Sequence, residues 1–341
     1  MQIEEFDPAA DGAQLRACFE MTQAGWPADH PAAAPWPLDS FTGKWIHGFA
    51  ARSQRCWLAT ADDGEPVGGY LLRLDEKENQ SVARCILIVR PDRRRAGVGR
   101  ALAAHCAGQA QLAGRTRLTA TVRDDSAGAA FAATLGAVSG MPEIDRILHL
   151  GSALPGRLMQ LRAAALPHAA GYSLVSWSGP VPGEFLGHVV QLHNAMADAP
   201  RDAGLEPMIW DAERIRASER DSTASGLRYH RVLAVHDRTG EAAGLTEICI
   251  DSGTPDWAFQ MMTAVVPAHR GHRLGVLIKV ANLEQLASAE PQVCRVLTGN
   301  AGSNEHMIAI NTQLGFEIAD VYRNWELDLA PLVQRGSRGQ S

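Results

Sequence analysis

Two arginine-rich turns that contain glycine are the parts of this sequence best suited to bind an anion. The first turn, Arg94 to Gly99, reads R-x-x-G-x-G between an apolar run at 86–89 and an alanine-rich stretch. Because the first N–H groups of a helix lack internal partners, such a turn binds phosphate, and guanidinium groups add charge-assisted contacts. The residues expected to contact the anion here are Arg94, Arg95, Ala96, Gly97, Val98, Gly99 and Arg100.

The second turn has the same pattern with one change, since Arg273 stands where the first glycine is expected. We expect the Arg273 N–H to remain available if its φ stays negative. The alternative to anion binding is that both basic runs are simply solvent-exposed helix starts. The residues expected to contact an anion in this turn are Arg270, Gly271, His272, Arg273, Leu274 and Gly275.

Several better-known sites are absent from the sequence. Neither turn matches the Walker loop G-x-x-x-x-G-K-[ST] or the dinucleotide pattern G-x-G-x-x-G, which disfavours ATP and NAD. H-E-x-x-H and G-x-S-x-G are also missing, so metallopeptidase and serine-hydrolase chemistry have no support. The six cysteines are scattered without any C-x-x-C, and we predict no metal site.

The two turns belong to an internal repeat. Val89-x-Pro91 matches Val265-x-Pro267, and Gly99 matches Gly275, at an offset of 275 − 99 = 176. Further on, the Leu-Gly pair at 135–136 matches the pair at 314–315 at an offset of 179. The repeat predicts two domains with one plan.

Alternation and helical periodicity predict the same element order in both copies, a mixed α/β fold. We expect domains at 1–150 and 173–335, a linker at 151–172 and a tail at 336–341. In the first copy we expect strands near 56–61, 67–75, 82–90, 117–122 and 144–150, with helices near 11–24, 38–50, 97–113 and 126–135. In the second copy we expect strands near 228–236, 243–251, 257–266, 293–299 and 316–328, with helices near 184–197, 272–288 and 303–313.

Composition narrows the possible partners. The chain has 341 residues and a formal net charge of −6, which argues against a broad nucleic-acid or anionic-membrane surface. No segment approaches the length of an apolar membrane span, and the N-terminus lacks the apolar core of a signal peptide. We therefore expect a cytoplasmic protein, a monomer or a homodimer, without membrane or nucleic-acid partners.

The R-x-x-G-x-G turn together with the element order resembles the GNAT superfamily of acyl-CoA-dependent N-acyltransferases. Two copies in tandem are similar to actinobacterial two-domain members such as mycothiol synthase-like proteins. The resemblance implies two GNAT-like domains, each a mixed, mostly antiparallel sheet flanked by helices, and acetyl-CoA (coenzyme A) as acyl donor. It also implies that a main-chain N–H near Val89 or Val265 polarises the thioester carbonyl.

The resemblance leaves the acid and base open. The tyrosine that protonates the thiolate in many GNATs is absent, because Ala132 and Asn311 occupy its two positions. Glu247 is the first choice for a general base, with a cross-strand partner as the alternative. His306 is a candidate for proton transfer, as are His269 and His272, although such histidines are more often caps or surface residues.

Substrate and coenzyme contacts can also be assigned to the second copy. Asp198 could bind a cationic amine, or simply end a helix before Pro200. Asn300 and Asn304 resemble the coenzyme-facing end of a strand and the helix after it. These polar residues lead us to expect catalysis in the second domain, while the first binds acyl-CoA structurally or has its own activity.

The leading functional hypothesis is an N-acetyltransferase that moves an acetyl group from acetyl-CoA to a primary amine. The acceptor would be a small polar metabolite or antibiotic-like compound that attacks directly in a ternary complex. The alternative is a catalytically silent acyl-CoA-binding or sensing protein, favoured by the missing tyrosines and by Arg273. An N-acetyltransferase for proteins or peptides is a third possibility.

Overall fold

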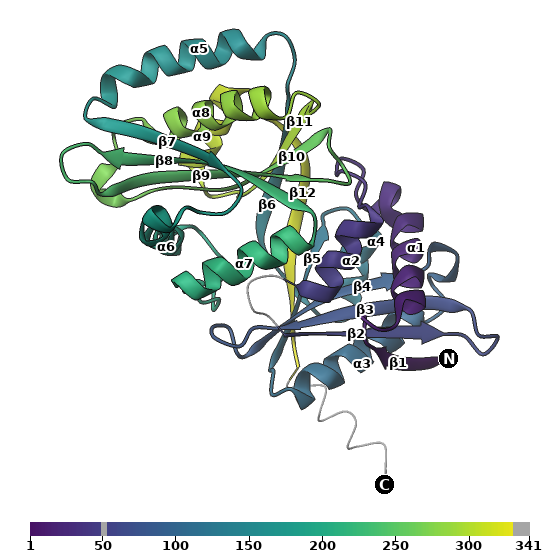
Figure 1. The fold of residues 1–341 in the computed structure, drawn as a ribbon. Coiled ribbons are helices and arrows are strands. Elements are labelled where there is room, and N and C mark those ends of the chain that lie inside the picture. The colour runs from purple at the N-terminus through teal and green to yellow at the C-terminus, as the bar shows by residue number, and fades with distance from the viewer. Residues whose placement is uncertain (49–52, 330–341) are drawn as a thin grey trace. The chain divides into compact units, whose positions relative to one another are not determined.

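We describe a computed structural model of the chain, which covers residues 1–48 and 53–329. The expected tail at 336–341 lies outside these residues. Contacts divide the chain into two compact units (Figure 1). The first unit comprises Met1–Pro142, Asp202–Glu206 and the chain from Val321, and the second comprises Glu143–Arg201 and Pro207–Asp320.

The first unit is built on a sheet with the order β1-β2-β3-β4-β5-β12, in which only β4 and β5 are parallel neighbours. Helix α3 packs on one face, and α1 and α2 pack on the other. Its elements are β1 (Gln2–Phe6), α1 (Gly12–Asp29), α2 (Leu38–His47), β2 (Ser53–Thr60), β3 (Pro66–Leu74), β4 (Val82–Val89), η1 (Pro91–Arg93), α3 (Val98–Leu112), β5 (Arg117–Arg123), α4 (Ala127–Thr134) and the end of β12 (Glu317–Asp328).

The second unit repeats this plan with the strand order β6-β11-β10-β9-β8-β7. Its elements are the end of β6 (Val138–His149), α5 (Leu154–Ala165), η2 (Leu166–His168), β7 (Tyr172–Ser178), η3 (Gly183–Phe185), α6 (Leu186–Ala195), η4 (Met196–Asp198), α7 (Ala212–Ala224), β8 (Leu227–His236), β9 (Ala242–Asp251), β10 (Trp257–Val265), η5 (Pro267–His269), α8 (Leu274–Ala289), β11 (Arg295–Ala301) and α9 (Glu305–Leu314).

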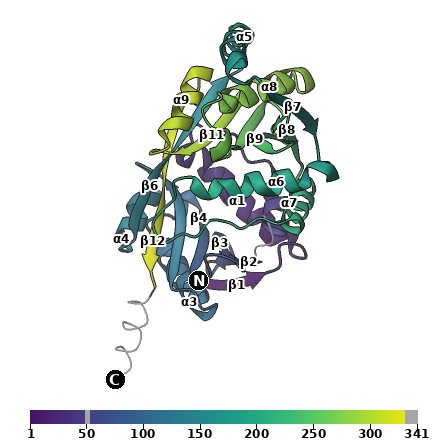
Figure 2. The same cartoon turned by 90° about the vertical axis from the view of Figure 1, so that its left-hand side faces the viewer.

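Alternation along the strands builds the layers of the second unit. Val232 and Ala234 point to the face covered by α8, whereas Leu233 between them points to the face covered by α6. Apolar side chains on both faces of β8 therefore bury both faces of the sheet. Helix α5 packs on the outside of α8, as both views show (Figures 1 and 2).

The last strand of each copy completes the sheet of the other unit. The end of β6, from the first copy, pairs antiparallel with β11 over Glu143–His149. The end of β12, from the second copy, pairs antiparallel with β5 over Tyr322–Asp328. Contacts therefore divide the chain at other points than the boundary expected after residue 150, and the predicted domain limits stay a prediction.

The mixed α/β class and the mostly antiparallel, helix-flanked sheets expected from the sequence are confirmed. Most expected strands and helices agree with the observed ones within a few residues. The sequence analysis missed β1 and β7, which are edge strands, and the polar helix α7. Among the described helices, none is both long and apolar enough to cross a membrane.

Candidate active site

The candidate site lies where two parallel neighbours of the second unit part. Strands β10 and β11 pair over Trp257–Phe259 and Arg295–Leu297, and beyond these residues β10 pairs with β9 alone. In the first unit β4 and β5 likewise pair over Val82–Arg84 and Arg117–Thr119. Parting strands leave edge N–H and C=O groups free for a ligand.

A bulge bends β10 at this point. Its register with β9 shifts between Gln260 and Thr263, so that two residues of β10 face one residue of β9. Buried polar contacts hold the bulge: the hydroxyls of Thr246 and Thr263 lie 2.8 Å apart, and Gln260 Nε2 donates to Glu247 O at 2.7 Å. A paired network of this kind fixes one conformation, because an unpaired partner would be costly to bury.

The turn after β10 has the same backbone as the turn after β4. In the first turn Arg95 (φ 67°) and Gly97 (φ 87°) are left-handed, and in the second Gly271 (φ 87°) and Arg273 (φ 54°) are. Each turn therefore places one glycine and one arginine at its two left-handed positions, in opposite order. The condition that we attached to the Arg273 N–H, a negative φ, is not met, yet the turn retains its conformation because Gly271 relieves the other position.

Both turns lead directly into a helix. Gly97 and Arg273 are the N-cap residues of α3 and α8, and neither helix start has a side-chain cap in the described structure. Gly275 lets α8 approach α9, since a Cβ there would lie 3.0 Å from Ile310 Cδ1. The result in the second unit is a helix N-terminus with open N–H groups beside arginines, which is suited to an anion.

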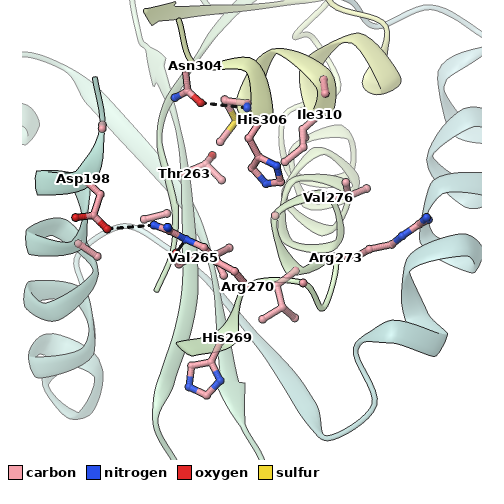
Figure 3. A pocket seen from close by; sticks show the side chains of 18 of the residues that line it. Asp198, Thr263, Val265, His269, Arg270, Arg273, Val276, Asn304, His306 and Ile310 are labelled. Atoms are coloured by element: carbon pink, nitrogen blue, oxygen red, sulfur yellow. Dashed lines mark hydrogen bonds and ion pairs between the residues drawn. The ribbon is translucent and has the colours of Figure 1, made fainter. Parts of the chain in front are cut away.

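A cavity of about 620 Å³ joins this helix start to the parted strands (Figure 3). Thr263 and Val265 on β10 form one side, and Asn304, His306 and Ile310 on α9 form another. The predicted site residues that line it are Asp198, Val265, His269, Arg270, Gly271, Arg273, Leu274, Gly275, Asn304 and His306. The other residues are Leu161, Ala195, Met196, Ala199, Pro200, Thr263, Ala264, Val276, Met307, Ala309, Ile310 and Gln313.

Backbone alternation directs one N–H of β10 into this gap. Val266 N donates to Ala243 O of β9 at 3.1 Å, so the N–H and C=O of Val265 face the opposite edge. In agreement, Val265 O accepts a hydrogen bond from Arg270 Nε at 3.2 Å rather than from β9. The N–H of Val265 therefore points to the side from which β11 has departed.

The motif arginine forms an ion pair with an aspartate in both units. Arg94 Nη2 lies 2.6 Å from Asp29 Oδ2, and Arg270 Nη2 lies 3.3 Å from Asp198 Oδ2. Asp198 thus lines the cavity, where Arg270 holds its carboxylate. Its predicted binding of a cationic amine stays a prediction, and an amine would have to compete with this guanidinium group.

Glu247 does not line the cavity. Its buried carboxylate lies 2.6 Å from Arg231 Nε and 3.4 Å from His193 Nε2. Burial would raise the pKa of Glu247, but the charges and hydrogen bonds of His193 and Arg231 outweigh it and lower the pKa to about 2. Such a carboxylate is a weak base at neutral pH, so the geometry argues against the predicted role, which stays untested.

All three predicted asparagines of the second unit make hydrogen bonds within the protein, and of these only Asn304 lines the cavity. Asn304 Oδ1 caps α9 by accepting from Met307 N at 3.2 Å, although the residue also lines the cavity. Asn311 is fully buried and donates from Nδ2 to Asn300 Oδ1 at 2.6 Å. Asn311 therefore does not take the place of the missing tyrosine at the cavity wall.

The histidines divide between cavity and support. His306, on α9, and His269 both line the cavity, and His269 Nδ1 also lies 2.9 Å from the Tyr172 hydroxyl group. His272 Nδ1 lies 3.1 Å from His168 O and does not line the cavity. Because the Nδ1 of His269 already contacts Tyr172, His306 is the candidate that we favour for proton transfer.

Sequence reasoning missed three polar residues in the interior: His193, Arg231 and Lys279. Arg231 contacts Glu247 from the opposite position on the neighbouring strand β8, and His193 contacts it from α6, which is distant in sequence. Lys279 is fully buried within α8. For Lys279, the position of a lysine among the apolar, core-facing positions of a helix was a sequence signal of a buried charge.

A diphosphate-type turn beside parted strands is the arrangement of an acyl-CoA-dependent transferase, and comparison with known proteins agrees. The profile of the Acetyltransferase (GNAT) family matches residues 15–137. A tandem GNAT protein from the clavulanic acid biosynthesis pathway, solved without AcCoA, is 32% identical, with 97% of this chain and 99% of that chain covered and a TM-score of 0.81. The chain therefore belongs to the GNAT acetyltransferase family, as a tandem acyl-CoA-dependent N-acyltransferase.

More distant structures share the fold. A GCN5-related N-acetyltransferase from Sphaerobacter thermophilus is 16% identical over 96% of this chain and 95% of that chain, with a TM-score of 0.65. A glucosamine N-acetyltransferase region of a fungal multi-domain β-N-acetylglucosaminidase is 12% identical, covers 96% of this chain and 38% of that chain, and has a TM-score of 0.64. No curated protein matches the chain.

Proposed function

We propose that the second unit transfers an acetyl group from acetyl-CoA to a primary amine of a small polar metabolite or antibiotic-like compound, by direct attack in a ternary complex. The observation that carries the proposal is the cavity itself, which connects the helix start after Arg273 to the parted edge of β10. Acetyl-CoA supplies an activated thioester whose thiolate leaves as the amide forms.

The residues present fit the coenzyme. The open N–H groups at the start of α8, with Arg270 and Arg273 beside them, suit a diphosphate. Beyond them the cavity wall becomes apolar at Val276, Met307 and Ile310, which suits a pantetheine arm. The same polarity change along one cavity supports binding of the whole coenzyme.

The proposed chemistry is mostly positioning. The Val265 N–H faces the gap, where it can hydrogen-bond the thioester carbonyl and stabilise charge that develops on its oxygen. An alkyl amine has a pKa of about 10.4 by analogy with lysine and must lose a proton before attack. We assign proton transfer to His306 or to water in the cavity, and assign to Glu247 the orientation of His193.

Charge reversal at the motif arginines tests whether the second unit binds acetyl-CoA and transfers the acetyl group. Arg270→Glu should weaken acetyl-CoA binding in the second unit and reduce turnover across an amine panel, while the matched variant Arg94→Glu in the first unit should leave turnover in place. Calorimetric titration with acetyl-CoA and thiol release measure the two effects separately. Unchanged turnover in Arg270→Glu would overturn the proposal.

The same measurements address the other candidates. Binding of acetyl-CoA without thiol release for any amine would favour a silent acyl-CoA-binding or sensing protein, for which the buried Asn311 in place of a tyrosine is the supporting observation. Release with peptides alone would favour a protein acceptor. The expected cytoplasmic location and the monomeric or homodimeric state also stay predictions.

A further inference from the structure

A lysine is buried beside the candidate site without lining it. Lys279, on α8, has a relative exposure of 1%, and its Nζ donates to Asn311 Oδ1 at 2.8 Å. Its Nζ also lies 5.3 Å from the centre of the Phe316 ring. An ammonium group is seldom buried unless it is paired, so this contact calls for a reason.

This hydrogen bond belongs to a polar network of Lys279, Asn311 and Asn300, which joins three elements. Asn311, on α9, receives the bond from Lys279 and donates to Asn300 Oδ1 on β11 at 2.6 Å. Helix α8 begins at the diphosphate-type turn, α9 forms a wall of the cavity, and β11 is the strand that parts from β10. These two hydrogen bonds therefore tie together α8 and α9, both of which line the cavity, and β11, the strand that parts from β10.

The first unit lacks this polar network although it has the same fold. The repeat places 279 − 176 = 103 and 311 − 179 = 132 at the positions of Lys279 and Asn311. The strand registers, with Thr119 opposite Arg84 and Leu297 opposite Phe259, place residue 122 at the position of Asn300. All three positions are apolar in the first unit: Ala103, Ala132 and Val122.

The polar network of the second unit is therefore not a requirement of the fold. The Lys279 side chain is 1% exposed, and this burial lowers its pKa to about 7. A buried polar group with fixed partners can specify one arrangement of the elements that it joins. The presence of this network in the unit with the cavity points to a role in the geometry of that site.

We propose that Lys279 is a positioning residue for acyl transfer, which fixes α9, a wall of the cavity, against α8 and β11 through Asn311 and Asn300. The inference rests on the proposed function. In this arrangement the Asn311 amide is used inside the protein, where the family resemblance would place an acid at the thiolate. Lys279 acts through the shape of the slot and touches no reacting atom.

Two substitutions separate the hydrogen bond from packing and charge. Lys279→Met keeps the length of the side chain without a donor, whereas Lys279→Gln keeps a donor without the charge. We expect Lys279→Met to reduce kcat/KM for acetyl-CoA by about tenfold to hundredfold, with the amine KM unchanged, because small displacements of a positioned group have effects of this size. Lys279→Gln should stay within about threefold of the wild type.

Tyr70→Phe is a matched control in the first unit. It removes a part-buried hydrogen bond between the hydroxyl group of the fully buried Tyr70 and His105 Nδ1 at 2.7 Å, which also joins a strand to a helix. We expect it to lower the melting temperature without changing either KM. A general loss of stability would therefore be distinguished from a change in the slot.

A ligand-free measurement keeps the inference separate from the proposed function. Amide hydrogen exchange in α9 should be faster in Lys279→Met than in the wild type, and should be unchanged in Lys279→Gln. Equal exchange in all three proteins, or equal kinetic loss in both variants, would overturn the positioning role. A wild type that neither binds nor consumes acetyl-CoA would instead overturn the proposed function.

Discussion

The left-handed residues of the second turn allow a sharp test of whether backbone conformation or charge binds the coenzyme. Gly271→Arg places a second non-glycine residue at positive φ in a turn that already has Arg273 there. The double variant Gly271→Arg/Arg273→Gly instead exchanges the two residues and copies the order of Arg95 and Gly97 in the first unit. The double variant has the same composition as the wild type.

The expected effect follows from the cost of the left-handed conformation. A Cβ at Gly271 would meet nothing within 4 Å, so the strain is in the backbone alone. That strain is about 1–2 kcal/mol for an L residue. If it depopulates the binding conformation of the turn, the Kd for acetyl-CoA rises about 5- to 30-fold in Gly271→Arg. In the double variant, one glycine and one arginine remain, and the Kd should stay within about threefold of the wild type.

Calorimetric titration with acetyl-CoA measures the Kd of the wild type, of Gly271→Arg and of the double variant. All three proteins also carry Arg94→Glu, which weakens binding at the first turn. Gly271→Arg adds a positive charge beside the diphosphate site, which by itself would strengthen anion binding. Weaker binding in spite of this charge would therefore support the backbone argument. Binding as tight as that of the wild type, or tighter, would refute it.

Three further predictions concern stability. Glu247→Gln should destabilise the protein by about 3–5 kcal/mol at pH 7 because it leaves Arg231 buried without its partner. The pKa of Glu247 lies near 2, below its ordinary 4.5. The stabilisation by the Glu247 carboxylate is therefore complete above about pH 5 and is lost as the pH falls toward 2. Equal denaturation midpoints at pH 7 would contradict this. The pKa of Lys279 lies near 7, below its ordinary 10.5, so between these pH values the unfolded chain binds a proton that the folded chain does not. The free energy of unfolding of the wild type should therefore rise relative to that of Lys279→Met by up to about 1.4 kcal/mol per pH unit in this range. A difference in unfolding free energy that stays flat from pH 7 to 10 would show that the buried amine is not desolvated. Fragments 1–150 and 151–341 should each lack a cooperative melt alone and regain it when mixed, because each sheet needs a strand of the other copy; a cooperative melt of either fragment alone would argue against the exchange.

The sequence was sufficient for the fold class because local patterns determine it. Alternating strands, helix periodicity and the offset of 176 between Gly99 and Gly275 predict two similar α/β halves. The exchange of β6 and β12 was not predictable, because period-2 patterns identify a strand without identifying its neighbour. Edge strands such as β1 and β7 were missed for the related reason that one partner leaves a weaker pattern.

The site was predictable where the backbone makes it and unpredictable where side chains from distant segments meet. The two turns were found from their glycines and arginines, although the left-handed φ of Arg273 was not expected. For Glu247 the sequence left two roles open, a base and a cross-strand partner, and the structure places it opposite Arg231 on β8 and beside His193 on α6. The effect of these charges on its pKa depends on distances in the folded chain that spacing in the sequence does not report.

The most direct test of the account is amide hydrogen exchange with and without acetyl-CoA over the segment from Thr263 to Val276. Bound coenzyme is expected to slow exchange at Val265 and at the open N–H groups of Leu274, Gly275 and Val276, since these would become hydrogen-bond donors to it. Saturating acetyl-CoA that leaves exchange throughout this segment unchanged would contradict it.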